Sequence, residues 1–309
     1  MNSLKKFNVK KVVIYLLGIM FVTLGLGTLI MLQTGTNLIK GTKPNHTVND
    51  SKTSSLTGID EIDVNVSSSD INIIPESTSQ VKAHFYGGIT SGGSYKNPEI
   101  QCYKSGNTLV IKQVQPHMFF GFSNSNLKLD VYIPSGYNKN IKLVSSSGDI
   151  NINVNGYHFN KLDCNLSSGS LTINDVTADT FKYSSSSGDL KADKLTTKTT
   201  ALDSSSGSIN INMFSGDLTS ESSSGDTSIK YADYHNNINV HSSSGEIELT
   251  LPKSAEFDLN AEASSGDVSC DFPVTVSGKN EHTLRGIVVN DTNKIKLDAS
   301  SGDIKILHN

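Results

Sequence analysis

Residues 143–152 read Leu-Val-Ser-Ser-Ser-Gly-Asp-Ile-Asn-Ile, and the central phrase of this stretch, Ser-Ser-Gly followed by Asp, Glu or Ser, recurs along the chain. The first seven glycines of the phrase are 21, 19, 19, 18, 20 and 21 residues apart, and the last step is 36. That last step is close to two ordinary steps, as if one copy had lost its signature. A period near 20 predicts a solenoid, in which each repeat stacks on the next. The glycines are Gly148, Gly169, Gly188, Gly207, Gly225, Gly245, Gly266 and Gly302.

Apolar residues alternate with polar ones on both sides of each glycine, which is the period of a β-strand. In the first copy the inward positions are Leu143, Ile150 and Ile152, and equivalent apolar positions occur in most later copies. The glycine and the Asp or Ser after it suit a tight corner between two strands. The sequence therefore predicts an all-β fold, a single-stranded β-solenoid with rungs of about 18–21 residues.

Two serines precede every one of the eight glycines, from Ser146 and Ser147 to Ser300 and Ser301. Small hydroxyl groups can pack at a crowded corner and form hydrogen bonds along a stack. Their repetition fits a stacking role better than a set of eight nucleophiles.

The residue after each glycine is acidic in six copies and serine in two, which predicts a carboxylate ladder along one edge of the solenoid. Such a ladder could bind calcium or a cationic peptide, or it could be a solvated row that caps turns. The Gly-Gly-x-Gly-x-Asp unit of calcium-binding β-rolls does not occur in the sequence, so we favour the second interpretation. The ladder residues are Asp149, Asp189, Asp226, Glu246, Asp267 and Asp303.

Residues 12–32 carry no charge and are mostly apolar, and as a helix they would span about 31 Å. Four lysines in residues 1–11 place this end in the cytoplasm by the positive-inside rule. We therefore expect a cytoplasmic tail (1–11), a single transmembrane anchor (12–32), a flexible linker (33–55) and an extracytoplasmic domain (56–309). A cleaved signal peptide ending near Gly25-Leu26-Gly27 is the alternative.

Outside the four tail lysines, 22 basic residues face 30 acidic ones, a net charge of 22 − 30 = −8. This balance argues against a nucleic-acid partner, which requires clustered basic residues. Three cysteines do not indicate a disulfide scaffold, and no spacing typical of a metal or cofactor site occurs, so we expect neither.

An irregular, cap-like part is expected over about residues 76–126. Before it, residues 62–73 resemble a rung that lacks its glycine. Within it, the apolar segment 116–122 could close the end of the solenoid or form an exposed contact patch.

The repeated Ser-Ser-Gly-Asp-Ile phrases, together with Ile133-Pro134, Leu251-Pro252 and the closing Asp298 to Ile306, resemble the bacterial putative-adhesin family. The resemblance covers roughly residues 56–309. It implies a β-solenoid attached to or exported across a bacterial membrane, in some members beside genes of the Gram-positive cell-envelope stress response. The family has no agreed catalytic residues, and none are carried over.

These observations favour a membrane-anchored, surface-exposed interaction protein without catalytic activity, acting as an adhesin or as an envelope-stress component. Its partner, a protein, peptide or polysaccharide of the envelope or surface, is not identified by the sequence. The alternatives are a polysaccharide-active β-helix enzyme and a binder of cationic antimicrobial peptides or Ca²⁺ through the acidic ladder. An enzyme would need two carboxylates at one defined place, whereas the ladder repeats the same group on many rungs.

Overall fold

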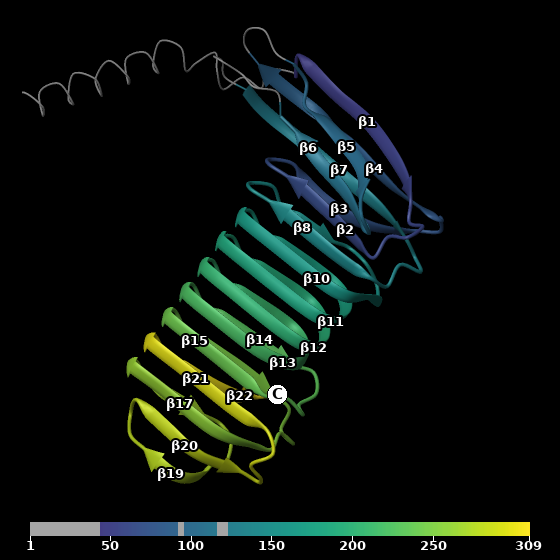
Figure 1. The fold of residues 1–309 in the computed structure, drawn as a ribbon. Coiled ribbons are helices and arrows are strands. Elements are labelled where there is room, and N and C mark those ends of the chain that lie inside the picture. Colours follow the sequence, from purple (N-terminus) through teal and green to yellow (C-terminus); the bar gives the residue numbers. More distant parts are fainter. Residues whose placement is uncertain (1–43, 92–95, 116–122) are drawn as a thin grey trace, which may run out of the picture. The chain divides into compact units, whose positions relative to one another are not determined.

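The computed structural model describes residues 44–91, 96–115 and 123–309, and within these residues the chain is all β (Figure 1). The prediction of an all-β fold is confirmed. The described part contains 22 strands and no helix of the length and apolarity that a membrane crossing requires. The expected tail, anchor and first part of the linker (1–43) and the expected cap segment 116–122 lie outside the described residues.

Each repeat contributes one strand before its glycine and one after it, and these strands build two faces. The first, which we call the pre-glycine face, has parallel pairing throughout its middle and antiparallel pairs at both ends. In stacking order its strands are β5 (Glu99–Ser105), β6 (Thr108–Val114), β2 (Glu61–Val66), β8 (Asn140–Ser145), β10 (Tyr157–Ser168), the second halves of β11 (Leu171–Ser187), β12 (Leu190–Ser206) and β13 (Ile209–Ser224), β15 (Ile238–Ser244), β21 (Lys294–Ser301), β17 (Phe257–Ser265), β20 (Thr283–Val288) and β19 (Thr275–Lys279).

The post-glycine face is built in the same way by the strands that follow the glycines. In stacking order they are β1 (His46–Ser55), β4 (Gln80–Ser91), β7 (Ser123–Pro134), β3 (Asp70–Glu76), β9 (Ile150–Ile152), the first halves of β11, β12 and β13, β14 (Thr227–Tyr231), β16 (Ile247–Leu251), β22 (Ile304–His308) and β18 (Val268–Cys270).

Like positions of successive rungs stack in register, which builds one continuous core between the two faces. Leu143 lies beside Cys164, which lies beside Tyr183, and all three side chains are buried. In the C-terminal rungs, aromatic rings fill the core in a chain of edge contacts with centroids 5.0–6.2 Å apart, which is a favourable geometry for aromatic pairs. This chain runs through the buried Phe214, Tyr231, Tyr234, Phe257 and Phe272 and ends on the exposed His308.

The glycine of each rung is required by the close approach of the neighbouring backbone. A Cβ built on Gly207 would stand 2.2 Å from the carbonyl oxygen of Gly188, and one built on Gly188 would stand 1.9 Å from that of Gly169. The same overlap recurs at every glycine of the repeat. Gly207 also has a φ of 142°, which other residues rarely adopt.

The serine expectation is corrected in one respect. The two serines directly before each glycine are largely exposed, as at Ser146 and Ser147, rather than packed inside the corner. The buried hydroxyl is one position earlier: Ser145 Oγ donates to the carbonyl oxygen of Gly148 at 2.8 Å and accepts from its N–H at 2.9 Å. Ser204 and Ser242 donate to the carbonyl oxygens of Gly207 and Gly245 in the same way, both at 3.3 Å, whereas Leu166, Ala263 and Ala299 occupy this position in other copies. The structural role therefore belongs to this position in some copies only.

The long step before Gly302 does not contain a lost copy, as the sequence suggested. Strand β21 pairs in parallel with β15 on one side and with β17 on the other, and β22 lies likewise between β16 and β18. The rung of Gly302 therefore lies between the rungs of Gly245 and Gly266. The 36-residue step instead holds the antiparallel strands β19 and β20, which continue the pre-glycine face beyond β17.

At the other end, the predicted rung without a glycine is present as β2 and β3. Its Ser69 takes the place of the missing glycine, since a Cβ on Gly148 would stand 2.0 Å from the carbonyl oxygen of Ser69. The predicted flexible linker (33–55) is wrong for residues 46–55, which form β1. This strand pairs with β4 along its whole length and buries Val48, interactions that a sequence poor in apolar residues did not reveal.

Candidate functional site

The carboxylate ladder is a row of hydrogen-bonded caps that joins neighbouring rungs. Asp149 Oδ1 accepts a hydrogen bond from the backbone N–H of Ser170 at 2.9 Å, and Asp189 Oδ1 accepts one from Ser208 at 2.8 Å. Asp226 and Asp303 do the same for the next rung at 2.9 and 3.0 Å. Charged acceptors make such bonds stronger than neutral ones. The ladder therefore has a structural role, and its side chains remain largely exposed to solvent.

The stacking order changes which ladder residues are neighbours. The ladder ends in four acidic residues on consecutive rungs, and because the rung of Gly302 is inserted, their order along the stack is Asp226, Glu246, Asp303 and Asp267. The earlier members Asp149 and Asp189 alternate with serines. Neighbouring rungs are about 4.8 Å apart. Acidic charge is therefore concentrated on the C-terminal rungs, where Lys305 pairs with Glu246 at 2.7 Å.

A second acidic column, four residues before each glycine, was missed by the sequence reasoning. Its members face solvent from the pre-glycine face and lie side by side in the order Asp203, Glu221, His241, Asp298 and Glu262. His241 Nδ1 lies 3.1 Å from Asp298 Oδ1, and the guanidinium of Arg285 lies 2.9 Å from Glu262 Oε2. An alignment of the copies on their glycines would have revealed the members of this column. It would not have revealed their order along the stack.

The two columns flank the same corner on the last four stacked rungs, and we call this surface the acidic corner. It carries seven carboxylates and one histidine, and exposed serines separate the columns. Among the described residues, three of the carboxylates have a basic partner: Lys305, Arg285 or the imidazole of His241, which is charged only when protonated. The remaining density of negative charge attracts cations at low ionic strength. The acidic corner consists of Glu221, Asp226, His241, Glu246, Asp298, Asp303, Glu262 and Asp267.

Charges on the N-terminal half of the pre-glycine face are balanced instead. Asp63, Lys142, Asp163 and Lys182 stack in alternating sign, and Lys161 pairs with Asp163 at 2.7 Å. Burial raises the pKa of Asp163, but hydrogen bonds from Lys161 and Asn165 outweigh it, and the net effect lowers that pKa. This half of the face offers no excess of either sign to a charged partner.

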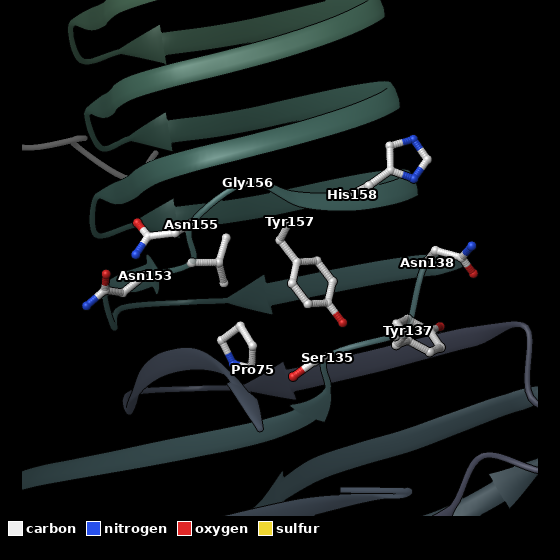
Figure 2. Close-up of a pocket in the computed structure, with 11 residues that line it drawn as sticks. Pro75, Ser135, Tyr137, Asn138, Asn153, Asn155, Gly156, Tyr157 and His158 are labelled. Atoms are coloured by element: carbon white, nitrogen blue, oxygen red, sulfur yellow. The ribbon is translucent and has the colours of Figure 1, made fainter. Parts of the chain in front are cut away.

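A hollow of about 680 Å³ opens where the first rungs meet the regular ones (Figure 2). Amide and hydroxyl groups surround it, and Tyr137 and Tyr157 lie against it with their hydroxyl groups bonded to backbone carbonyl oxygens at 2.5 Å. No carboxylate lines this hollow, so it lacks the acid pair of a glycoside hydrolase. Its lining is Pro75, Ser135, Gly136, Tyr137, Asn138, Asn153, Val154, Asn155, Gly156, Tyr157 and His158.

Neither a preformed metal site nor a reactive cysteine is indicated in the described part of the chain. It contains no group of three or more His, Cys, Asp or Glu side chains placed to hold a metal ion. Cys102, Cys164 and Cys270 are free, and burial raises the pKa of each thiol, which disfavours the reactive thiolate.

The fold defines the class of protein: an all-β repeat protein whose rungs stack through a glycine corner. The chain belongs to the Toastrack DUF4097 family, which matches residues 59–307. The matched residues include the rungs, the acidic corner and the strands β19 and β20. A comparison with the curated proteins finds no match.

Solved structures of bacterial proteins resemble the chain at low sequence identity. A putative adhesin from Bacteroides fragilis is 16% identical, with a TM-score of 0.49, over 86% of this chain and all of that one. One from Parabacteroides merdae is 12% identical, with a TM-score of 0.43, over 85% of this chain and 98% of the other. A putative cell adhesion protein from Clostridium sporogenes is 16% identical, with a TM-score of 0.23, over 85% of this chain and all of that one.

Proposed function

We propose that this chain is a membrane-anchored interaction module without catalytic activity, with its N-terminus in the cytoplasm and its rungs outside the cell membrane. It acts in adhesion or in the response to cell-envelope stress. The observation that carries the proposal is the acidic corner, an exposed surface of repeated side chains over a filled core. A surface of this kind suits an extended partner better than a small substrate.

We further propose that the partner contacted by the acidic corner is cationic, such as a lysine-rich peptide. Seven carboxylates that have two permanently charged partners and one histidine among the described residues favour a positively charged ligand. Calcium is a weaker candidate, because the ladder carboxylates already accept backbone hydrogen bonds with one oxygen and the described residues contain no preformed cluster of ligands.

The test of the surface uses two triple variants of the full chain and a lysine-rich peptide. The first variant carries Asp226→Asn, Asp303→Asn and Asp267→Asn. Its matched control carries Asp70→Asn, Asp149→Asn and Asp189→Asn on the N-terminal rungs, where Asp70 follows Ser69 and its Oδ1 accepts a hydrogen bond from the N–H of Asp149 at 3.1 Å. Asparagine keeps an oxygen that can accept the cap, so both variants should fold.

We expect peptide binding to weaken steeply with salt and to be lost in the first variant only, because screened charges attract poorly. Equal loss in both variants would show that the total charge, not the acidic corner, is recognised. Salt-insensitive binding that survives in both would contradict a cationic partner and direct attention to the hollow at Tyr157.

The membrane topology is tested separately. Protease added to intact cells should digest a tag placed after Asn309, whereas a tag before Met1 should be protected. The opposite pattern would overturn the proposed orientation and leave the acidic corner without access to an external partner.

A further inference from the structure

The rung of Gly302 fills a gap between two rungs that both precede it in the sequence. Strands β15 and β16 border this gap on one side, and β17 and β18 border it on the other. We call this gap the slot and its occupant, residues 294–308, the inserted rung. Without the inserted rung, both walls of the slot would expose unpaired strand edges, which readily pair with another chain.

The inserted rung is held in the slot by buried apolar side chains and by charged pairs on its outer side. Ile295, Leu297, Ile304 and Ile306 of that rung are at most 1% exposed, so its apolar side chains complete the core. On the outside, Asp298 meets His241 and Lys305 meets Glu246. A second copy of this chain carries the same inserted rung and therefore satisfies the same contacts.

The connection to the inserted rung is strained and exposed at Val289, while Asn290 and Asn293 after it are half-buried and donate hydrogen bonds to Glu256. Val289, directly after β20, has a φ of 65° and is the one non-glycine residue with a positive φ in the described part of the chain. This conformation is unfavourable for a β-branched side chain, and the valine is 77% exposed, so no packing compensates for it. Strain in a short hinge favours exchange of the segment that it connects, because an extended hinge releases it.

We propose that the inserted rung exchanges between two copies of this chain, so that each copy fills the slot of the other. Residues 289–293 act as the hinge of this exchange. All contacts of the slot are retained in the exchanged pair, and only the hinge changes its conformation. The partner is a second copy, and the inference does not depend on the proposed cationic ligand.

Cysteine pairs across the slot test this exchange directly. Asn239 and Lys296 are direct neighbours on β15 and β21, and both side chains are exposed. Two differently tagged full-length copies are produced together in one cell, one with Asn239→Cys and the other with Lys296→Cys. Both have Cys102, Cys164 and Cys270 replaced by alanine. A disulfide between the two tags then requires the inserted rung of one copy in the slot of the other.

Three controls interpret the result. One chain that carries both new cysteines should form the internal disulfide, which shows that the inserted rung docks correctly. Replacing Asn239→Cys by Asn210→Cys, on the other face, should abolish the link. Val289→Gly relaxes the hinge and should reduce the linked fraction by about tenfold, the equivalent of releasing one strained residue.

Deletion of Asp291 and Thr292 should instead raise the fraction of protein linked between copies. The shortened hinge can no longer bring the inserted rung back into the slot of its own copy. We expect most of that variant to be linked between copies. The proposal is overturned if the internal disulfide forms fully while neither the original pair nor the deletion variant yields a disulfide between copies.

Discussion

Asp303 caps Asp267: its Oδ1 accepts a hydrogen bond at 3.0 Å from the backbone N–H of a residue that precedes it by 36 positions. This bond fastens the inserted rung to the rung beyond it. Asp303→Ala removes the acceptor and should lower the free energy of unfolding by about 1–2 kcal/mol. Asp303→Asn should cost less, because its amide oxygen can still accept the bond. Urea unfolding of the two variants measures the difference, and equal losses would contradict the capping role.

Gly207→Ala should be strongly destabilising. Its Cβ would overlap the carbonyl oxygen of Gly188, and the positive φ of Gly207 is unfavourable for alanine, so we expect a loss of roughly 3 kcal/mol. Gly278→Ala is the matched control, since open space surrounds that glycine. It should change stability by less than about 0.5 kcal/mol. A similar melting temperature for the two variants would show that the stack relaxes around the added methyl group.

Two neighbouring tyrosines of the core should respond differently to loss of the hydroxyl group. Tyr231 donates to the carbonyl oxygen of Gly216 at 3.1 Å, so Tyr231→Phe should cost about 1 kcal/mol. The hydroxyl of Tyr234 is buried without a hydrogen-bond partner, so Tyr234→Phe should be neutral or stabilising. Chemical unfolding of both variants distinguishes the sites, and a larger loss at Tyr234 would reveal an unrecognised partner.

Alkaline pH should weaken the fold through its buried tyrosines. Burial raises the pKa of Tyr157 from 10.0 to about 12, so the folded state holds its proton more tightly than the unfolded state. This contribution to stability is complete below pH 10 and is lost as the pH rises towards 12. Unfolding free energies measured from pH 8 to pH 11.5 should fall, and Tyr157→Phe should fall less steeply. Parallel curves for the two proteins would contradict this assignment.

Much of the fold could be predicted from the repeat, because each copy carries the same local information. The alternation around Gly148 gives the two strands and their buried faces, and the glycine itself marks the corner. These features depend on interactions within a rung or between identical neighbours. A single sequence with a clear period is sufficient to infer them.

The order of the last rungs could not be predicted in this way. Nothing local to Gly302 distinguishes a rung that continues the stack from one that inserts between two others, since both would present the same strands. Insertion depends on the pairing of β21 with β15, between residues 57 positions apart such as His241 and Asp298. The ladder column of the acidic corner was predicted, but the order of the side chains within the corner was not, because the stacking order decides which of them are neighbours.

The glycine corners stay stacked in close backbone contact although the rungs differ in length. The 18-residue step to Gly225 is accommodated by a register shift between Thr196 and Thr199 on β12, away from the corner. Insertions and deletions of single residues are therefore tolerated on the side of a rung away from the glycine. At the glycine corner, length can change only by a whole repeat. Gain or loss of one unit of about 20 residues would change the reach of the protein by roughly 4.8 Å without altering the chemistry of its edge. The distance at which the acidic corner would meet the proposed cationic partner can thus evolve separately from the chemistry of the corner.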